Sequence, residues 1–184
     1  ENTATGWQSL KANTTGNYNS AFGLGTLQTN TTGSYNTATG QQSLYSNTTA
    51  SNNTASGYRA LFLNTTGYYN TATGYSSLRT NTTGSRNTAL GYNAADSVTT
   101  GANNVALGAD TLGNVTTQNH NVAIGRASQQ LATGTANVAL GYRALAANTT
   151  SSDNTALGYQ SLGASNGGQH NTGVGAYALF DTTT

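Results

Sequence analysis

The stretch Asn70–Arg86 reads NTATGYSSLRTNTTGSR, and from Asn87 the chain begins again with NTALGYNAAD. Both segments open with the motif Asn-(Thr/Val)-Ala-x-Gly, which recurs with small variations from one end of the chain to the other. Its asparagines are Asn2, Asn19, Asn36, Asn53, Asn70, Asn87, Asn104, Asn121, Asn137, Asn154 and Asn171. They are 17 residues apart in nine cases and 16 apart in one, between Asn121 and Asn137. A motif that keeps nearly constant spacing along the whole chain predicts one tandem-repeat domain over residues 1–184 and argues against a flexible linker.

Each repeat suits short strands joined by turns, when the motif asparagine is counted as position 1. The motif alternates β-branched and small residues, as a strand does, and Asn-Thr-Thr-Gly at positions 12 to 15 predicts a turn with positive φ. Thr, Asn and Gly are poor helix formers. We therefore predict an all-β fold, a parallel β-solenoid of eleven coils, with two short strands and two turns in each 17-residue coil.

In such a solenoid, equivalent residues stack at about 4.8 Å, so eleven coils make a rod roughly 50 Å long. A buried Asn column then satisfies its polar groups by hydrogen bonds between coils. The glycine at position 5 is expected at a corner that needs a positive φ or has no room for a Cβ. These corner glycines are Gly6, Gly23, Gly40, Gly57, Gly74, Gly91, Gly108, Gly125, Gly141, Gly158 and Gly175.

The composition excludes several classes of protein. Of the 184 residues, 35 are Thr, 24 Asn and 23 Gly, with no Pro, Cys or Met. The absence of Cys excludes disulfide scaffolds and thiolate metal sites. A net charge of +1 argues against electrostatic nucleic-acid binding. The longest apolar runs are a few residues, so we expect no membrane insertion.

Charge and leucine divide the repeat into inner and outer columns. The eleven charged residues occupy only positions 6, 7, 10, 11 and 17, which therefore face solvent. Position 9 is Leu in nine repeats, which predicts a core column. Positions 2 and 4 project to one side of the strand and Ala at position 3 to the other. That outer face is Thr-rich in early repeats and apolar in later ones, so we expect a partner chain to cover it.

The segments Asn-Val-Ala-Ile-Gly at Asn121–Gly125 and Asn-Val-Ala-Leu-Gly at Asn104 and Asn137 resemble the YadA-like head repeat of trimeric autotransporter adhesins. Similar arrays occur in phage tail fibres. The resemblance implies a left-handed β-roll, a homotrimer, and an extracellular place in a cell-surface fibre or phage tail fibre. The family places this strand toward the trimer axis. Carried over, the subunit interface is Val105, Leu107, Val122, Ile124, Val138, Leu140, Leu157 and Val174.

No catalytic constellation, cofactor site or metal site is evident, so we do not expect an enzyme. His120 and His170 share position 17 and are expected to be exposed turn residues. Recurrent Asn-x-Thr sequons are better explained by turn chemistry than by glycosylation. Aromatic residues at position 6 are possible surface contacts, although ring stacking that stiffens the rod is the favoured explanation. They are Trp7, Tyr58, Tyr75, Tyr92, Tyr142 and Tyr159.

Three functions remain open. The leading one is a structural and adhesive fibre protein, a segment of a longer fibre that meets a host-surface glycan or protein receptor through many weak contacts. The second is a self-assembling filament whose subunits stack end to end. The third is an ice-binding solenoid that uses Thr-x-Thr arrays such as Thr3/Thr5 and Thr37/Thr39, which Phe22 interrupts. For the short repeat, we expect the missing residue to be lost from the turn after Gln129 without a change of strand register.

Overall fold

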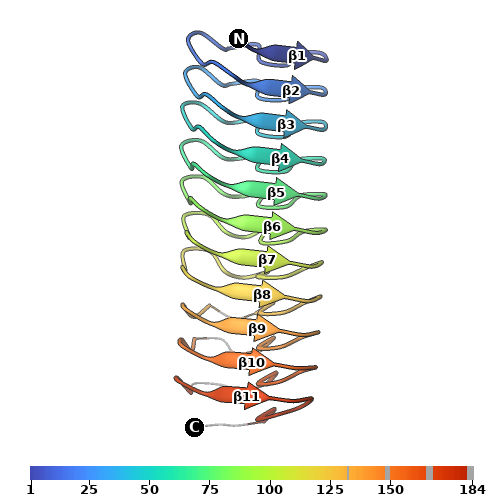
Figure 1. Ribbon diagram of the computed structural model, residues 1–184, viewed down its shortest axis with the longest axis vertical. Helices are drawn as coiled ribbons and strands as arrows, with labels where there is room; N and C mark the ends of the chain where they lie inside the picture. Colours follow the sequence, from blue (N-terminus) through green and yellow to red (C-terminus); the bar gives the residue numbers. More distant parts are fainter. Residues whose placement is uncertain (132, 148–149, 165–167, 182–184) are drawn as a thin grey trace.

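The computed structural model describes residues 1–131, 133–147, 150–164 and 168–181. The chain forms a column of stacked coils, with the first and the last repeat at opposite ends (Figure 1). Each coil contributes one three-residue strand, formed by positions 2 to 4. The strands are β1 (Thr3–Thr5), β2 (Ser20–Phe22), β3 (Thr37–Thr39), β4 (Thr54–Ser56), β5 (Thr71–Thr73), β6 (Thr88–Leu90), β7 (Val105–Leu107), β8 (Val122–Ile124), β9 (Val138–Leu140), β10 (Thr155–Leu157) and β11 (Thr172–Val174).

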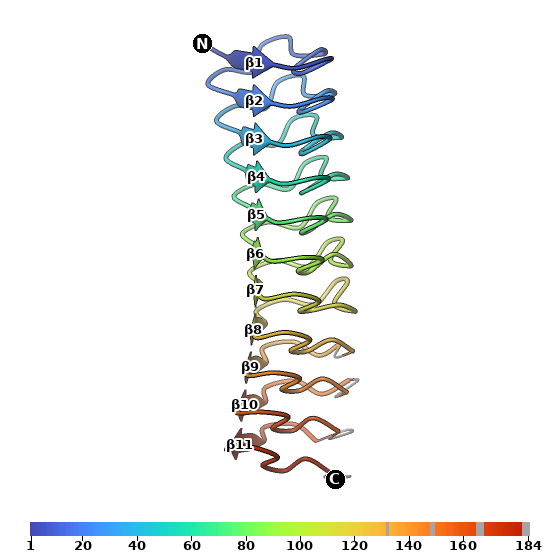
Figure 2. The ribbon, with the colours of Figure 1, turned by 90° about the vertical axis from the view of Figure 1, so that its right-hand side faces the viewer.

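The strands make a single parallel sheet in chain order, β1 to β11. Equivalent residues pair directly, as Ala38 does with Ala55 and Ala106 with Ala123. The all-β parallel solenoid predicted from the repeat is therefore confirmed. With the sheet toward the viewer, each strand runs from left to right and the chain returns behind it while descending, which makes the coil left-handed (Figures 1 and 2).

The prediction of two strands per coil was wrong, because the rest of each coil is built from turns. These turns still bond from coil to coil. Leu10 N–H donates to the Thr26 carbonyl at 3.0 Å, Thr14 N–H to Thr31 at 2.9 Å, and Gly23 N–H to Thr5 at 2.8 Å. Pairing between coils thus continues well beyond the three strand residues, which compensates for the shortness of each strand.

Turns of this kind need left-handed backbone, and the residues that supply it differ from those expected. Positions 7, 9 and 17 have positive φ, as in Arg59 (54°), Leu61 (52°) and Tyr69 (57°). The corner glycines at position 5 also have positive φ, for example Gly40 at 113°. The Asn-Thr-Thr-Gly turn does not use positive φ. Its glycine is required for space, because a Cβ at Gly16 would overlap the carbonyl oxygen of Gly33.

The core is a narrow column of Leu at position 9 and Ala at position 3. Seven of the core leucines are fully buried: Leu27, Leu44, Leu61, Leu78, Leu112, Leu145 and Leu162. Among the described residues, the core forms two clusters, one ending at Ala123 and the other beginning at Ala139. The break falls at coil 8, where position 9 is the buried Gln129. A polar side chain here interrupts the apolar contact between neighbouring coils.

Coil 8 is also the coil with 16 residues. Val122 still pairs with Val138, so the strand register is unchanged, as predicted. Leu131 N–H donates to Ala146 as in the longer coils, and Asn121 Nδ2 reaches Gly134, 13 residues away instead of 14. The shortening therefore lies between Leu131 and Gly134, after Gln129 as expected, and residue 132 is outside the described residues.

Candidate functional site

The outer face of the sheet carries two side-chain columns, from positions 2 and 4, while the alanines between them are buried from β2 to β10. From β1 to β5 these columns are mainly Thr and Ser, with Phe22 as the exception. From β6 onward at least one residue of each strand is apolar. Leu90 is 52% exposed and Val174 65%. The second half of the rod thus presents a continuous apolar strip to its surroundings.

All of the residues predicted at a subunit interface lie on this apolar strip. Val105, Leu107, Val122 and Ile124 are half-buried by their neighbours in the chain. Val138, Leu140, Leu157 and Val174 are exposed. Leu90 extends the strip by one coil and was not in the predicted set, although its position in the repeat could have identified it.

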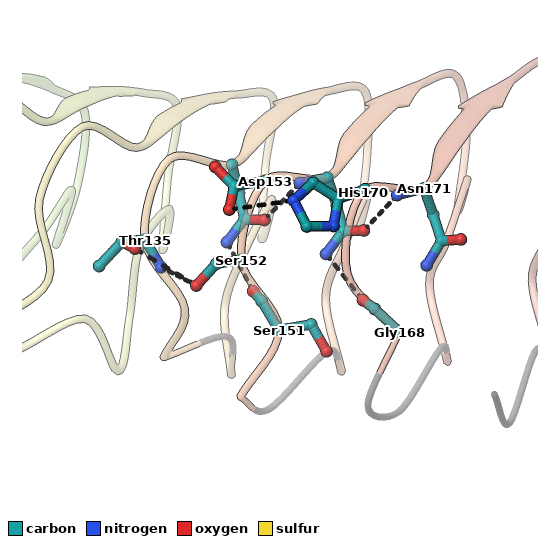
Figure 3. Close-up of polar contacts among 9 residues, drawn as sticks. Thr135, Ser151, Ser152, Asp153, Gly168, His170 and Asn171 are labelled. Atoms are coloured by element: carbon teal, nitrogen blue, oxygen red, sulfur yellow. Dashed lines mark hydrogen bonds and ion pairs between the residues drawn. The ribbon is translucent and has the colours of Figure 1, made fainter.

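The position 1 asparagines form a buried column that ties each coil to itself and to the next coil. In coil 2, Asn19 Nδ2 donates to the Gly33 carbonyl at 2.8 Å, and Asn19 Oδ1 accepts from the backbone N–H of Asn36 at 3.0 Å. Figure 3 shows the same arrangement near the last coils, where Gly168 accepts from Asn154 and the Asn171 N–H reaches the same side chain. From Asn2 to Asn154 each amide therefore satisfies backbone groups of two coils, whereas Asn171 Nδ2 is buried with no hydrogen-bond partner among the described residues.

A second asparagine column, at position 12, was assigned from the sequence to turn chemistry alone. Asn30 Nδ2 donates to Asn13 Oδ1 at 2.8 Å, and the pattern continues coil by coil to Asn81. Each Nδ2 also donates to the position 15 carbonyl of its own coil, as Asn47 does to Ala50 at 2.9 Å. This column buries Asn30, Asn47, Asn64 and Asn81, and the side-chain nitrogen of each donates hydrogen bonds. The same 17-residue spacing that identified the first column could have identified this one.

Threonine hydroxyls make a third set of contacts between coils. At position 13, Oγ1 donates to the backbone carbonyl of the next position 13 residue, from Thr14 to Thr31 at 2.9 Å through Thr99 to Thr116 at 3.1 Å. These position 13 hydroxyl groups therefore link each coil to the next. On the strand face, the Thr-x-Thr array is interrupted by Phe22, as the sequence indicates, and ends at β5.

The aromatic columns form ring stacks along the rod. Tyr75 stacks between Tyr58 and Tyr92, with ring centroids 5.1 and 5.2 Å apart, and Tyr142 stacks on Tyr159 at 5.4 Å. Both faces of Tyr75 and one face of each of the other rings are therefore used in stacking within the chain. Trp7 is different: it is 72% exposed, and no described ring stacks on it.

Titratable groups are sparse, and they lie on the surface. His170 Nε2 lies 3.9 Å from Asp153 Oδ2, an exposed pair (Figure 3). No group of three or more His, Cys, Asp or Glu residues able to hold a metal ion occurs among the described residues. The pKa of Tyr159 is raised, first by its hydrogen bond with Tyr177 and next by the charge of that phenol. Over the described parts of the chain there is likewise no helix long and apolar enough to cross a membrane.

Comparison with protein-family models, with curated proteins and with solved structures finds no match.

Proposed function

We propose that this chain is a rigid segment of an extracellular fibre, assembled from three copies that pack through the apolar strip. The observation that carries the proposal is the uninterrupted apolar character of the strip from Leu90 to Val174. Monomeric soluble proteins rarely expose a long contiguous apolar surface. The coil has only one narrow interior, so a second layer of chain is needed to cover the strip. The number three comes from the resemblance to the YadA-like head repeat.

The role in the fibre would be mechanical and adhesive. Buried amide columns and hydrogen bonds between coils hold every winding to the next, which makes a stiff shaft. The surface carries little charge and repeats its side chains at each level, so weak contacts with a glycan or protein receptor would add up. The exposed ring of Trp7 offers an aromatic face for stacking on a sugar.

Light scattering coupled to size exclusion tests the assembly. We expect the mass of three chains for the unchanged protein and the mass of one chain for Leu140→Lys, because an unpaired charge is costly inside an interface. The matched control is Thr39→Lys, which changes the same position of the repeat on the polar part of the sheet and should leave the trimer intact. A monomer at every concentration for the unchanged protein would refute the trimer.

A filament formed by end-to-end stacking is the second candidate. The observation in its favour is that β1 and β11 are the edges of the sheet, each with unpaired backbone groups on one side. Electron microscopy over a range of concentrations separates the candidates: filaments that lengthen with concentration support stacking, while particles of fixed length support the closed trimer.

A further inference from the structure

A surface cavity of about 200 Å³ lies beside the last three coils. It is formed by the columns at positions 7, 10 and 11, away from the apolar strip. The residues that define it are Arg143, Ala146, Gln160, Gly163, Ala164 and Phe180. Its walls combine small side chains and one aromatic ring with polar groups that include one guanidinium and one amide.

The same columns are filled in coils 3 and 4, which gives an internal reference. There Tyr45 and Phe62 stack at position 10 with ring centroids 5.2 Å apart. The guanidinium of Arg59 lies 5.1 Å from the centre of the Phe62 ring. Its Nε also donates to Gln42 Oε1 at 2.8 Å. At this level of the rod the guanidinium therefore has an amide as its hydrogen-bond partner and an aromatic ring beside it.

Coils 9 and 10 keep the cation and the amide and lack the rings. At position 7, coil 9 has Arg143 and coil 10 has Gln160, which are the two residue types found at this position in coils 3 and 4. At position 10 these two coils have Ala146 and Gly163 instead of aromatic residues. Among the described residues, neither the Arg143 guanidinium nor the Gln160 amide has a hydrogen bond or ion pair. Phe180 closes the cavity from coil 11, since a Cβ at Gly163 would come within 2.9 Å of its ring.

We propose that this cavity binds a small aromatic carboxylate with a single ring. The ring would occupy the space that aromatic side chains fill at position 10 in coils 3 and 4. Cavities of roughly 150 Å³ accommodate a benzene-sized ring, so the volume fits. The ring would lie against Phe180 and the alanines, with the guanidinium of Arg143 near it as Arg59 is near Phe62. The carboxylate would pair with the same guanidinium, and Gln160 would donate a further hydrogen bond.

Titration of the full chain with benzoate, followed by NMR chemical shifts or calorimetry, tests the site. We expect a dissociation constant on the order of a millimolar, as befits so small a ligand. Arg143→Gln should weaken binding at least about tenfold, through loss of the charged hydrogen bond. Ala146→Phe should abolish it, because the new ring occupies the cavity. Arg126→Gln, which removes an exposed cation at position 6 of coil 8, should leave binding unchanged.

The variants are compared at equal fold content, which circular dichroism reports, and the assembly state is measured separately. Cyclohexanecarboxylate carries the same charge without an aromatic ring and should bind at least about fivefold more weakly. Benzoate binding that survives both Arg143→Gln and Ala146→Phe would overturn the proposal, as would equal binding of the two carboxylates or no saturable binding of benzoate. Because the cavity lies apart from the apolar strip, this result is independent of whether the chain forms trimers.

Discussion

Coils 2 to 5 and coils 6 to 8 solve the same packing problem differently. In the first region the leucine column is unbroken, position 12 is Asn, and the outer sheet face is mostly polar. In the second, position 9 includes Ala95 and Gln129, position 12 is Val98 and Val115, and the outer face is apolar. The strand register is the same in both.

The difference shows that a buried column can be polar or apolar, provided that neighbouring coils carry residues of the same kind in that column. An amide column needs an acceptor in one adjacent coil and a donor in the other, whereas a valine column needs only apolar contact. The mismatch appears where the two meet. In the described part of the chain Asn81 Oδ1 is buried without a hydrogen-bond partner, because the next residue in its column is Val98. Each change of column type therefore carries a cost at its boundary.

The strongest way to break the first region is to charge its leucine column. Leu61→Asp buries a carboxylate with no partner between two leucines, and we expect it to lower the free energy of unfolding by more than about 4 kcal/mol. Thermal and denaturant unfolding followed by circular dichroism measures the change. Leu63→Asp, at an exposed position of the same coil, should cost less than about 1 kcal/mol. Equal effects for the two variants would contradict the assigned core.

Replacing an asparagine with valine should cost more inside the amide column than at its end. Asn47→Val leaves Asn30 Oδ1, Asn64 Nδ2 and the Ala50 carbonyl without this partner, which should cost about 3 kcal/mol. Asn81→Val removes a group that is already partly unsatisfied and should cost about 1 kcal/mol less. Chemical denaturation of both variants gives the difference. A larger loss for Asn81→Val would show that the column does not act as a chain of bonds.

Gln129→Leu should stabilise the second region, coils 6 to 8. Gln129 is fully buried; among the described residues its Oε1 has no hydrogen-bond partner and its Nε2 makes only a 3.5 Å contact with Asn121 Oδ1. Leucine would rejoin the two core clusters and should raise the free energy of unfolding by about 1–2 kcal/mol. The melting temperature measures it, with Gln130→Leu as the half-buried control in the same coil. A lower melting temperature for Gln129→Leu would mean that the glutamine is needed in the short coil.

The smallest effect concerns the tyrosines of the last coils. Tyr177→Phe removes the hydrogen bond that raises the pKa of Tyr159, so this phenol should titrate at lower pH. A raised pKa in the folded state favours the protonated form, and stability is lost as pH rises through the titration. Absorbance of phenolate against pH measures the shift. An unchanged titration curve would exclude the hydrogen bond as its cause.

Periodicity and charge were enough to predict the solenoid, the Asn column and the inward Ala and Leu, because each depends on one residue type recurring at one position. The single strand per coil was not predictable from propensity, because left-handed backbone at Leu61 and its equivalents runs against the ordinary preference of leucine. The stacked coil stabilises it through bonds that local sequence does not reveal. The cavity was not predictable either, because it exists where Ala146 and Gly163 stand in place of the aromatic side chains that coils 3 and 4 have at position 10.

The direct superposition of coils also bears on how such a chain changes over generations. Each winding touches only the one before it and the one after it. Recombination between repeats in the gene can therefore add or remove whole windings, and a junction between windings of the same column type reproduces contacts that the protein already makes. Even the loss of one residue in coil 8 is absorbed within a turn. The reach of the molecule can in this way be lengthened or shortened in small equal steps without the invention of any new packing.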